Sequence, residues 1–184
     1  MRNIVIIVGS KSDLKQCRKG LEWLRDNENV VSVVKVHIAS QPRHTWRVQN
    51  ILEDLAASPN PPDAIIAGAG WANHLTGCCD AYLRYTLRND RIPVIGVAFQ
   101  DKDNEDHTTA AILSISCVPG TQVVFTPNGK DLVLQNEFIG EDGFYRACVH
   151  AATGELPKIT LKDPPEQLDL SLAESLKLAQ PSTK

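Results

Sequence analysis

The chain has 184 residues, of which 42% are hydrophobic and 22% charged, and its formal net charge is -3. This length suits one domain with one core. The 19 basic residues are outnumbered by 22 acidic ones and form no basic arm or stripe, which argues against nucleic acid as the main partner. The apolar run after Met1 is too short for a signal peptide or a membrane span, so we expect a cytoplasmic protein without membrane contact.

Short runs rich in isoleucine and valine alternate along the chain with segments of helical spacing. We expect strands buried on both faces at residues 4–8, 31–36, 64–67, 93–97 and 122–125, and helices at 13–25, 45–57, 74–87, 106–116 and 141–152. Strict alternation of strand and helix predicts an α/β fold, a doubly wound flavodoxin-like or Rossmann-like sandwich of three layers around a central parallel sheet.

The C-terminal part of the chain reads differently. We predict one α/β domain at residues 1–157, followed at 158–184 by a linker, a C-terminal helix and a tail. The linker is expected at 158–164, and leucines then recur in an amphipathic segment at Leu168, Leu170, Leu172, Leu176 and Leu178. Such a trailing helix is expected to pack on a neighbouring subunit or on its own body.

The cysteine pattern is uninformative for metals or disulfides. The five cysteines are odd in number and show no C-x-x-C spacing, so we expect reduced thiols and neither a disulfide framework nor a zinc site. Cys78 and Cys79 are adjacent, but on a helix they point in different directions. Small packed side chains are therefore favoured over a redox pair.

The first strand ends in a turn of sequence Gly-Ser-Lys-Ser-Asp. Gly9 allows close backbone approach, Ser10 and Ser12 supply hydroxyls, and Asp13 lies at the mouth of the next helix. Exposed amides and the helix dipole there favour an anion, while Asp13 suits hydroxyls such as those of a ribose. The alternative is that these residues only cap the helix. The turn lacks the glycine and lysine pattern of a Walker A loop.

Two further turns follow strands in the same way. The turn after residues 64–67 carries Gly68, Gly70 and His74, and the dipole of the following helix favours a neutral imidazole at that position. The segment at 37–45 carries Arg43, which can bind phosphate bidentately, with His37 or His44 beside it. We expect the three strand ends to converge on one ligand. The acidic loop at 101–106 is interpreted as solvated, and no metal ligand set is evident.

Four segments together resemble the PurE family, the N5-carboxyaminoimidazole ribonucleotide mutases and aminoimidazole ribonucleotide carboxylases of purine biosynthesis. They lie at residues 9–13, 67–77, 92–97 and 113–120. The resemblance implies a flavodoxin-like sandwich assembled as a homo-octamer, with active sites between subunits and no metal or organic cofactor. It also implies that the mutase moves a carboxylate from N5 to C4 of an aminoimidazole ribonucleotide by release and recapture of carbon dioxide, with a histidine shuttling the proton.

The resemblance carries over residue by residue. Ser10, Ser12 and Asp13 match the substrate-binding turn, and a second wall is matched by Ala69, Gly70, His74 and Leu75. The Ser-Ala-His-Arg-Thr-Pro loop of the family falls on residues 40–45. There it keeps Ser40 and the phosphate-binding arginine as Arg43, but it puts Pro42 where the catalytic histidine belongs, and His44 is the nearest substitute.

The chain departs from the family pattern at several positions. Trp71 replaces a usual glycine, Asn73 an alanine, Thr76 a proline, and Ala110-Ala111 the usual Asp-Ser. A tryptophan beside the ligand would shrink or reshape the pocket. Three hypotheses follow: an active mutase using His74 with help from His44, a non-catalytic or repurposed nucleotide-binding oligomer, and a direct carboxylase, which His74 disfavours.

Overall fold

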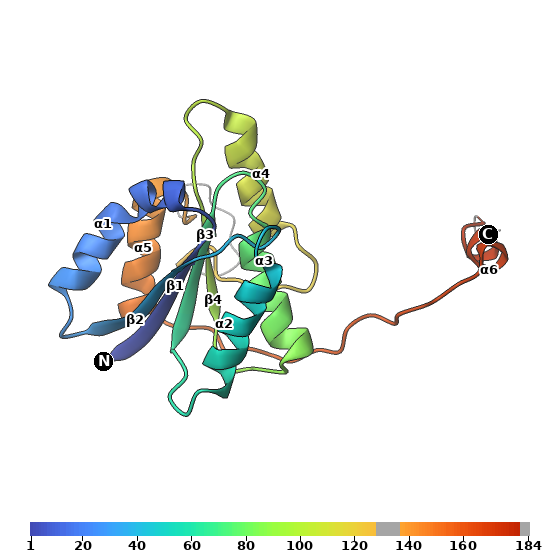
Figure 1. Ribbon diagram of the computed structural model, residues 1–184, viewed down its shortest axis with the longest axis horizontal. Helices are drawn as coiled ribbons and strands as arrows, with labels where there is room; N and C mark the ends of the chain where they lie inside the picture. Colours follow the sequence, from blue (N-terminus) through green and yellow to red (C-terminus); the bar gives the residue numbers. More distant parts are fainter. Residues whose placement is uncertain (128–136, 181–184) are drawn as a thin grey trace.

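A computed structural model describes residues 1–127 and 137–180 of the chain. Its centre is a four-stranded parallel sheet with the strand order β2-β1-β3-β4 (Figure 1). The strands are β1 (Arg2–Val8), β2 (Val31–Ile38), β3 (Ala64–Ala69) and β4 (Val94–Ala98). Parallel pairing brings the carboxyl ends of all four strands to one edge of the sheet.

Helices cover both faces of the sheet (Figure 1). They are α1 (Leu14–Asp26), α2 (Thr45–Ala57), α3 (His74–Ala81), α4 (Glu105–Ser116), α5 (Gly140–Thr153) and α6 (Leu172–Leu178), with single turns η1 (Lys11–Asp13) and η2 (Tyr82–Thr86). α1 and α5 pack on one face, α2 and α3 lie on the other, and α4 contacts α3 and β4. The predicted three-layer α/β sandwich is confirmed.

The core consists of two layers separated by the sheet. Ile4, Ile6 and Val8 of β1 lie in the layer under α1 and α5, whereas Val5 and Ile7 lie in the layer under α2 and α3. All five are fully buried. Side chains of β1 therefore alternate between the two layers, and both faces of the strand are covered, as expected for a central parallel strand.

β2 corrects the expectation that every strand is buried on both faces. It is the outer strand of the sheet, and the large apolar side chains of Val34, Val36 and Ile38 are exposed. An edge strand has a neighbour on one side, so part of its surface stays uncovered in a single copy of the chain.

The predicted strand at 122–125 is wrong as a regular strand. Val124 forms an isolated parallel bridge with Ile95: its N–H donates to the carbonyl oxygen of Val94 at 2.9 Å, and its carbonyl accepts from the N–H of Gly96 at 2.8 Å. The segment thus lies beside β4 in the position of a fifth strand, but it is joined to β4 by this single bridge. Pro127 follows shortly after and has no N–H to extend the pairing.

The predicted helix at 74–87 is also interrupted. α3 ends at Ala81 and widens into the π-helical turn η2. Arg84 of this turn is buried and pairs with the Asp80 carboxylate at 3.0 Å, and its other nitrogens donate to the carbonyl oxygens of Asn89 and Ile92, each at 2.6 Å. The buried guanidinium thereby fixes the loop that leads into β4.

The first part of the predicted linker at 158–164 contacts the body of the protein. Ile159 is buried, and the Thr160 backbone and the Gln122 side chain exchange two hydrogen bonds of 2.7 and 3.0 Å. Arg88 contacts Asp163 at 3.2 Å. Ile159 and Thr160 therefore pack on the body, and the chain beyond them is attached by an exposed ion pair.

α6 stands apart from the body at the end of an extended segment (Figure 1). It spans seven residues and buries none, so it does not pack on its own chain. Its start is stabilised by a capping box between Ser171 and Glu174. No helix in the described ranges is both long enough and apolar enough to cross a bilayer.

The five cysteines are free thiols with different environments. Cys17, Cys79 and Cys148 are buried, while Cys78 and Cys117 are exposed. Burial raises the pKa of Cys17 to about 12 and raises that of Cys148 well above its usual value. Cys79 is therefore a packed side chain as predicted, whereas the exposure of Cys78 corrects that prediction for its neighbour.

Candidate functional site

A cavity of about 490 Å³ opens at the edge of the sheet where β1, β2 and β3 end. All of the predicted site residues except His44 line it. The cavity wall is formed by Gly9, Ser10, Ser12, Asp13, Ser40, Gln41, Pro42, Arg43, Ala69, Gly70, Trp71, Ala72, His74 and Leu75. Three turns from separate βα units therefore meet at one place.

Gly9 lets the first and third turns come into contact. A Cβ atom at this position would lie 2.8 Å from the Cβ of Ala69 and 3.3 Å from a carboxylate oxygen of Asp13. The Gly9 N–H also donates to the Gly68 carbonyl oxygen at 2.9 Å. The floor of the cavity is thus set by a backbone approach that only glycine permits.

The first turn carries three polar side chains, those of Ser10, Ser12 and Asp13. Ser10 and Asp13 stand at the N-cap positions of η1 and α1, yet neither forms a side-chain capping hydrogen bond. The Ser10 and Ser12 hydroxyl oxygens instead lie 2.6 Å apart. Asp13 in turn accepts hydrogen bonds from the side chain and the backbone of Ser10, so the polar groups of this turn bond to one another at the cavity wall.

Asp13 is partly buried at the cavity wall, and burial raises the pKa of its carboxyl above the usual value of 3.8. Hydrogen bonds from Ser10 and the positive charge of Arg43 oppose that increase. Asp13 therefore lies within electrostatic reach of Arg43, although the two residues belong to different βα units.

The turn at 40–45 is organised around Ser40, which is buried. Its carbonyl oxygen accepts from the N–H groups of Arg43 and His44, and its hydroxyl accepts from Nε of Arg43 at 3.2 Å. Within the described part of the chain, the terminal nitrogens of the Arg43 guanidinium make no hydrogen bond. They remain available for a bidentate contact with an anion.

The structure does not bring His44 into the cavity wall. Its Nδ1 accepts a hydrogen bond from the Ser40 N–H at 3.3 Å, and the residue stands at the N-cap position of α2. Pro42 lines the cavity instead. Among the described residues of the wall, His74 is the only histidine.

Asn73 and Thr76, two departures from the family pattern, hold the start of α3 in place. Asn73 is fully buried, donates from Nδ2 to the Val97 carbonyl oxygen at 2.9 Å, and accepts at Oδ1 from the Thr76 N–H at 3.2 Å. Thr76 Oγ1 contacts the Ala67 carbonyl oxygen at 2.9 Å. This network ties α3 to the ends of β3 and β4 and so positions His74 at the cavity.

Four wall residues lie outside the predicted set: Gln41, Pro42, Trp71 and Ala72. The Oε1 atom of Gln41 is buried, and no described hydrogen-bond donor reaches it. The only signal in the sequence for Gln41 is its place between Ser40 and Arg43. Trp71 was predicted to reshape the pocket, and it does line the wall.

The acidic loop at 101–106 is exposed to solvent, as predicted, except for the half-buried Asp101. Asp101 accepts from Nδ1 of His107 at 2.7 Å and from the Asp103 N–H at 3.0 Å, and this His107 hydrogen bond is the main reason that the pKa of the Asp101 carboxyl is lowered. Across residues 1–127 and 137–180, no group of three or more His, Cys, Asp or Glu side chains is placed to hold a metal ion.

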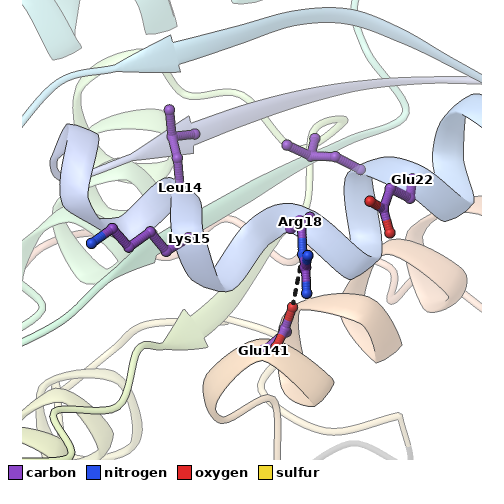
Figure 2. A pocket seen from close by; sticks show the side chains of 6 residues that line it. Leu14, Lys15, Arg18, Glu22 and Glu141 are labelled. Carbon is purple, nitrogen blue, oxygen red and sulfur yellow. Dashed lines mark ion pairs between the residues drawn. The ribbon is translucent and has the colours of Figure 1, made fainter.

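A larger hollow of about 660 Å³ lies along α1 (Figure 2). Its walls are apolar surface and long charged side chains, and Arg18 and Glu141 form a loose ion pair of 3.9 Å between largely exposed groups. It lacks strand-end turns and converging backbone amides. Its size alone therefore does not make it the better candidate.

Comparisons with known proteins identify the family of this chain and structures of similar fold. A family model described as AIR carboxylase matches residues 3–129. A crystal structure of a substituted PurE2 from Treponema denticola is similar, with 24% identity, a TM-score of 0.51, and 67% of this chain and 70% of that chain covered. A Treponema denticola PurE structure covers 82% of this chain and 86% of that chain at 20% identity and a TM-score of 0.48. No curated relative matches.

Proposed function

Because this chain belongs to the AIR carboxylase family, which acts in purine biosynthesis, we propose that it is an N5-carboxyaminoimidazole ribonucleotide mutase. The reaction moves a carboxylate from the exocyclic N5 to C4 of the aminoimidazole ring. The observation that carries this proposal is the single cavity in which a hydroxyl-rich turn, an arginine and a histidine converge from three βα units.

The wall supplies a group for each part of the substrate. The Arg43 guanidinium, fixed at Nε by Ser40, would bind the phosphate. Asp13 suits the ribose hydroxyls, with Ser10 and Ser12 beside it. Gly9, Ala69, Gly70 and Leu75 would shape the floor and far wall against which the sugar and ring lie.

His74 is proposed to move the proton. Cleavage of the N5–carboxylate bond releases carbon dioxide, and the nitrogen takes a proton from the imidazolium form of His74, which becomes a neutral imidazole. C4 of the ring then attacks carbon dioxide, and the proton displaced from C4 returns to the imidazole. The histidine ends as it began, so one residue within reach of both ends is sufficient. His44 would assist only if the Ser40–His44 hydrogen bond opened.

The state and location of the protein belong to the same proposal. We place it in the cytoplasm, where its free thiols would stay reduced. We also propose a homo-octamer with the cavity near subunit contacts. The exposed apolar side chains of edge strand β2 and of α6 are surfaces that such contacts would cover.

A second candidate is a non-catalytic or repurposed relative that binds the ribonucleotide. It is favoured by one observation: Pro42 occupies the loop position of the family's histidine, while His44 is bonded to Ser40 outside the cavity wall. Direct carboxylation with free carbon dioxide is a third candidate, and it uses the same binding groups.

Turnover assays separate these candidates. The purified protein should convert N5-carboxyaminoimidazole ribonucleotide to the C4-carboxylated isomer, and His74→Asn should lower kcat by at least about 100-fold, the scale of general acid–base catalysis. His44→Asn is the matched control, with little change expected. Ligand-induced thermal stabilisation without turnover would support the binding protein. Turnover of aminoimidazole ribonucleotide with bicarbonate, but not of the N5-carboxylated substrate, would support the carboxylase.

A further inference from the structure

Trp71 has an unusual conformation at the cavity. It lies in the turn between β3 and α3 with φ of 57°, a left-handed conformation that a bulky side chain rarely adopts. The indole is 64% exposed, so it contributes little to the core. A strained backbone that holds a large apolar ring in the open requires an explanation other than packing.

The indole is braced from one side by His107 of α4. The two rings stack with centroids 4.1 Å apart and an angle of 21° between their planes. His107 is itself held at both nitrogens, by Asp101 at 2.7 Å from Nδ1 and by Asn104 at 3.3 Å from Nε2. The Trp71 side chain is therefore fixed to α4, although its backbone belongs to the turn after β3.

The hydrogen bonds also orient the imidazole. Oδ1 of Asn104 accepts from the Asp106 N–H at 3.0 Å, which leaves the Asn104 amide NH₂ facing Nε2 of His107. Nδ1 faces a carboxylate oxygen of Asp101 on the other side of the ring. The ring behind Trp71 is thus held in a defined orientation.

We propose that Trp71 is an aromatic platform on which the planar heterocycle of the ligand stacks. One face of the indole is covered by His107, and the residue lines the same cavity as the groups suited to a sugar phosphate, Ser10, Asp13 and Arg43. A flat ring joined to ribose phosphate fills both parts of such a site. The ring's identity as an aminoimidazole rests on the proposed function, whereas the demand for a flat ring does not.

The test compares two ligands that differ only in the ring. Aminoimidazole ribonucleotide and ribose 5-phosphate are titrated against the full chain and its Trp71→Gly and Trp71→Phe variants. Trp71→Gly should weaken ribonucleotide binding about 10-fold, the effect of losing one stacked ring, and leave ribose 5-phosphate binding unchanged. Trp71→Phe should stay within about 3-fold of the parent, because an aromatic face remains.

Folding is controlled within the same set of variants. Glycine adopts the left-handed conformation without strain, so Trp71→Gly should melt no lower than the parent. Trp23→Phe and Trp46→Phe together leave Trp71 as the only tryptophan of the chain, so that its fluorescence can be measured directly. Its fluorescence should change on addition of the ribonucleotide and not on addition of ribose 5-phosphate.

Several results would overturn the platform. They are equal weakening of both ligands in Trp71→Gly, unchanged ribonucleotide binding in that variant, and a fluorescence change that follows self-association of the protein rather than ligand. The mutase proposal is tested separately. If the ribonucleotide changes Trp71 fluorescence but is not turned over, the platform is supported and the mutase is not. If the ribonucleotide is turned over but Trp71 has no effect on its binding, the mutase is supported and the platform is not.

Discussion

Arg43 shows how a single side chain can be oriented for an anion by its own turn. Ser40 accepts from Nε and from the Arg43 backbone N–H, which directs the guanidinium while leaving its terminal nitrogens for a ligand. A bidentate contact of this kind discriminates strongly between a phosphate and a neutral hydroxyl.

Arg43→Ala should therefore weaken binding of aminoimidazole ribonucleotide by about 10- to 100-fold, from loss of a charge-assisted hydrogen bond. Binding of the unphosphorylated nucleoside should change little. Isothermal titration with both ligands measures this difference, and Arg47→Ala, in the first turn of α2 and outside the cavity wall, is the matched control. Equal losses for the two ligands would remove Arg43 from the phosphate role.

We expect the Asp13 carboxylate to lower the stability of the folded protein at neutral pH while it contributes to ligand binding. Burial raises the pKa of its carboxyl above 3.8, so the folded state binds the proton more readily than the unfolded state does. The contribution of this carboxyl to the free energy of unfolding consequently falls as the pH rises from its pKa in the unfolded state through its higher pKa in the folded state. Asp13→Asn should raise the Tm at about pH 7, with a smaller gain at about pH 4.

The same Asp13→Asn variant should bind the ribonucleotide more weakly, because an amide is a poorer acceptor for ribose hydroxyls. Calorimetric melts at the two pH values and a titration at neutral pH check both effects. A variant that is less stable at neutral pH, or equally stabilised at both, would contradict this account of Asp13.

The start of α3 is held in place by a few buried polar contacts. Asn73→Ala would leave the Val97 carbonyl oxygen and the Thr76 N–H without their partners, at a cost of about 1–3 kcal/mol in the free energy of unfolding. Because His74 follows directly, turnover should fall as well. Urea unfolding measures the stability, and exposed Asn60→Ala is the control. An unchanged unfolding midpoint would show that the network is not needed.

The order of elements is predictable from the sequence because buried parallel strands are short apolar runs bounded by turn residues. β1, β3 and β4 follow this pattern, and α2 spans the predicted residues 45–57. The exposure of β2 and the single bridge of Val124 were not predictable, because both depend on which neighbours the sheet provides. The docking of residues 158–163 depends on side chains far away in the sequence.

The site was predictable to a similar degree. Residues that follow parallel strands must share one edge of the sheet, which is why Ser10, Arg43 and His74 could be expected together. The direction of His44 is decided by one hydrogen bond within its turn, and the bracing of Trp71 is decided by a helix that begins more than thirty residues later. Spacing along the chain carries no information about either.

At the scale of the whole molecule, α6 is the element without a partner. Its leucines are exposed, and it buries no residue against the body. A chain ending at Asp163 should therefore unfold within about 0.5 kcal/mol of the parent, the range of surface changes. If α6 packs on a neighbouring subunit, the truncated chain should also form smaller oligomers.

Analytical ultracentrifugation and chemical denaturation of the truncated chain test these two expectations. The double variant Leu172→Ser and Leu176→Ser, which keeps the chain length, is the matched control for loss of the apolar surface. An unchanged assembly size in both would mean that α6 takes no part in association. A large loss of stability without dissociation would mean that the arm folds back on its own body.

The approach of Gly9 to Ala69 has a consequence for how a ligand would be captured. Because the Gly9 N–H bonds to the Gly68 carbonyl oxygen and even a Cβ atom at Gly9 would clash with Ala69, the two turns have no room to close further around an incoming molecule. Recognition on this side of the cavity is therefore preorganised. Affinity there should respond to atomic fit rather than to loop closure, and Gly9→Ala should spread the two turns and slow capture while leaving the chemistry of the bound state unaltered.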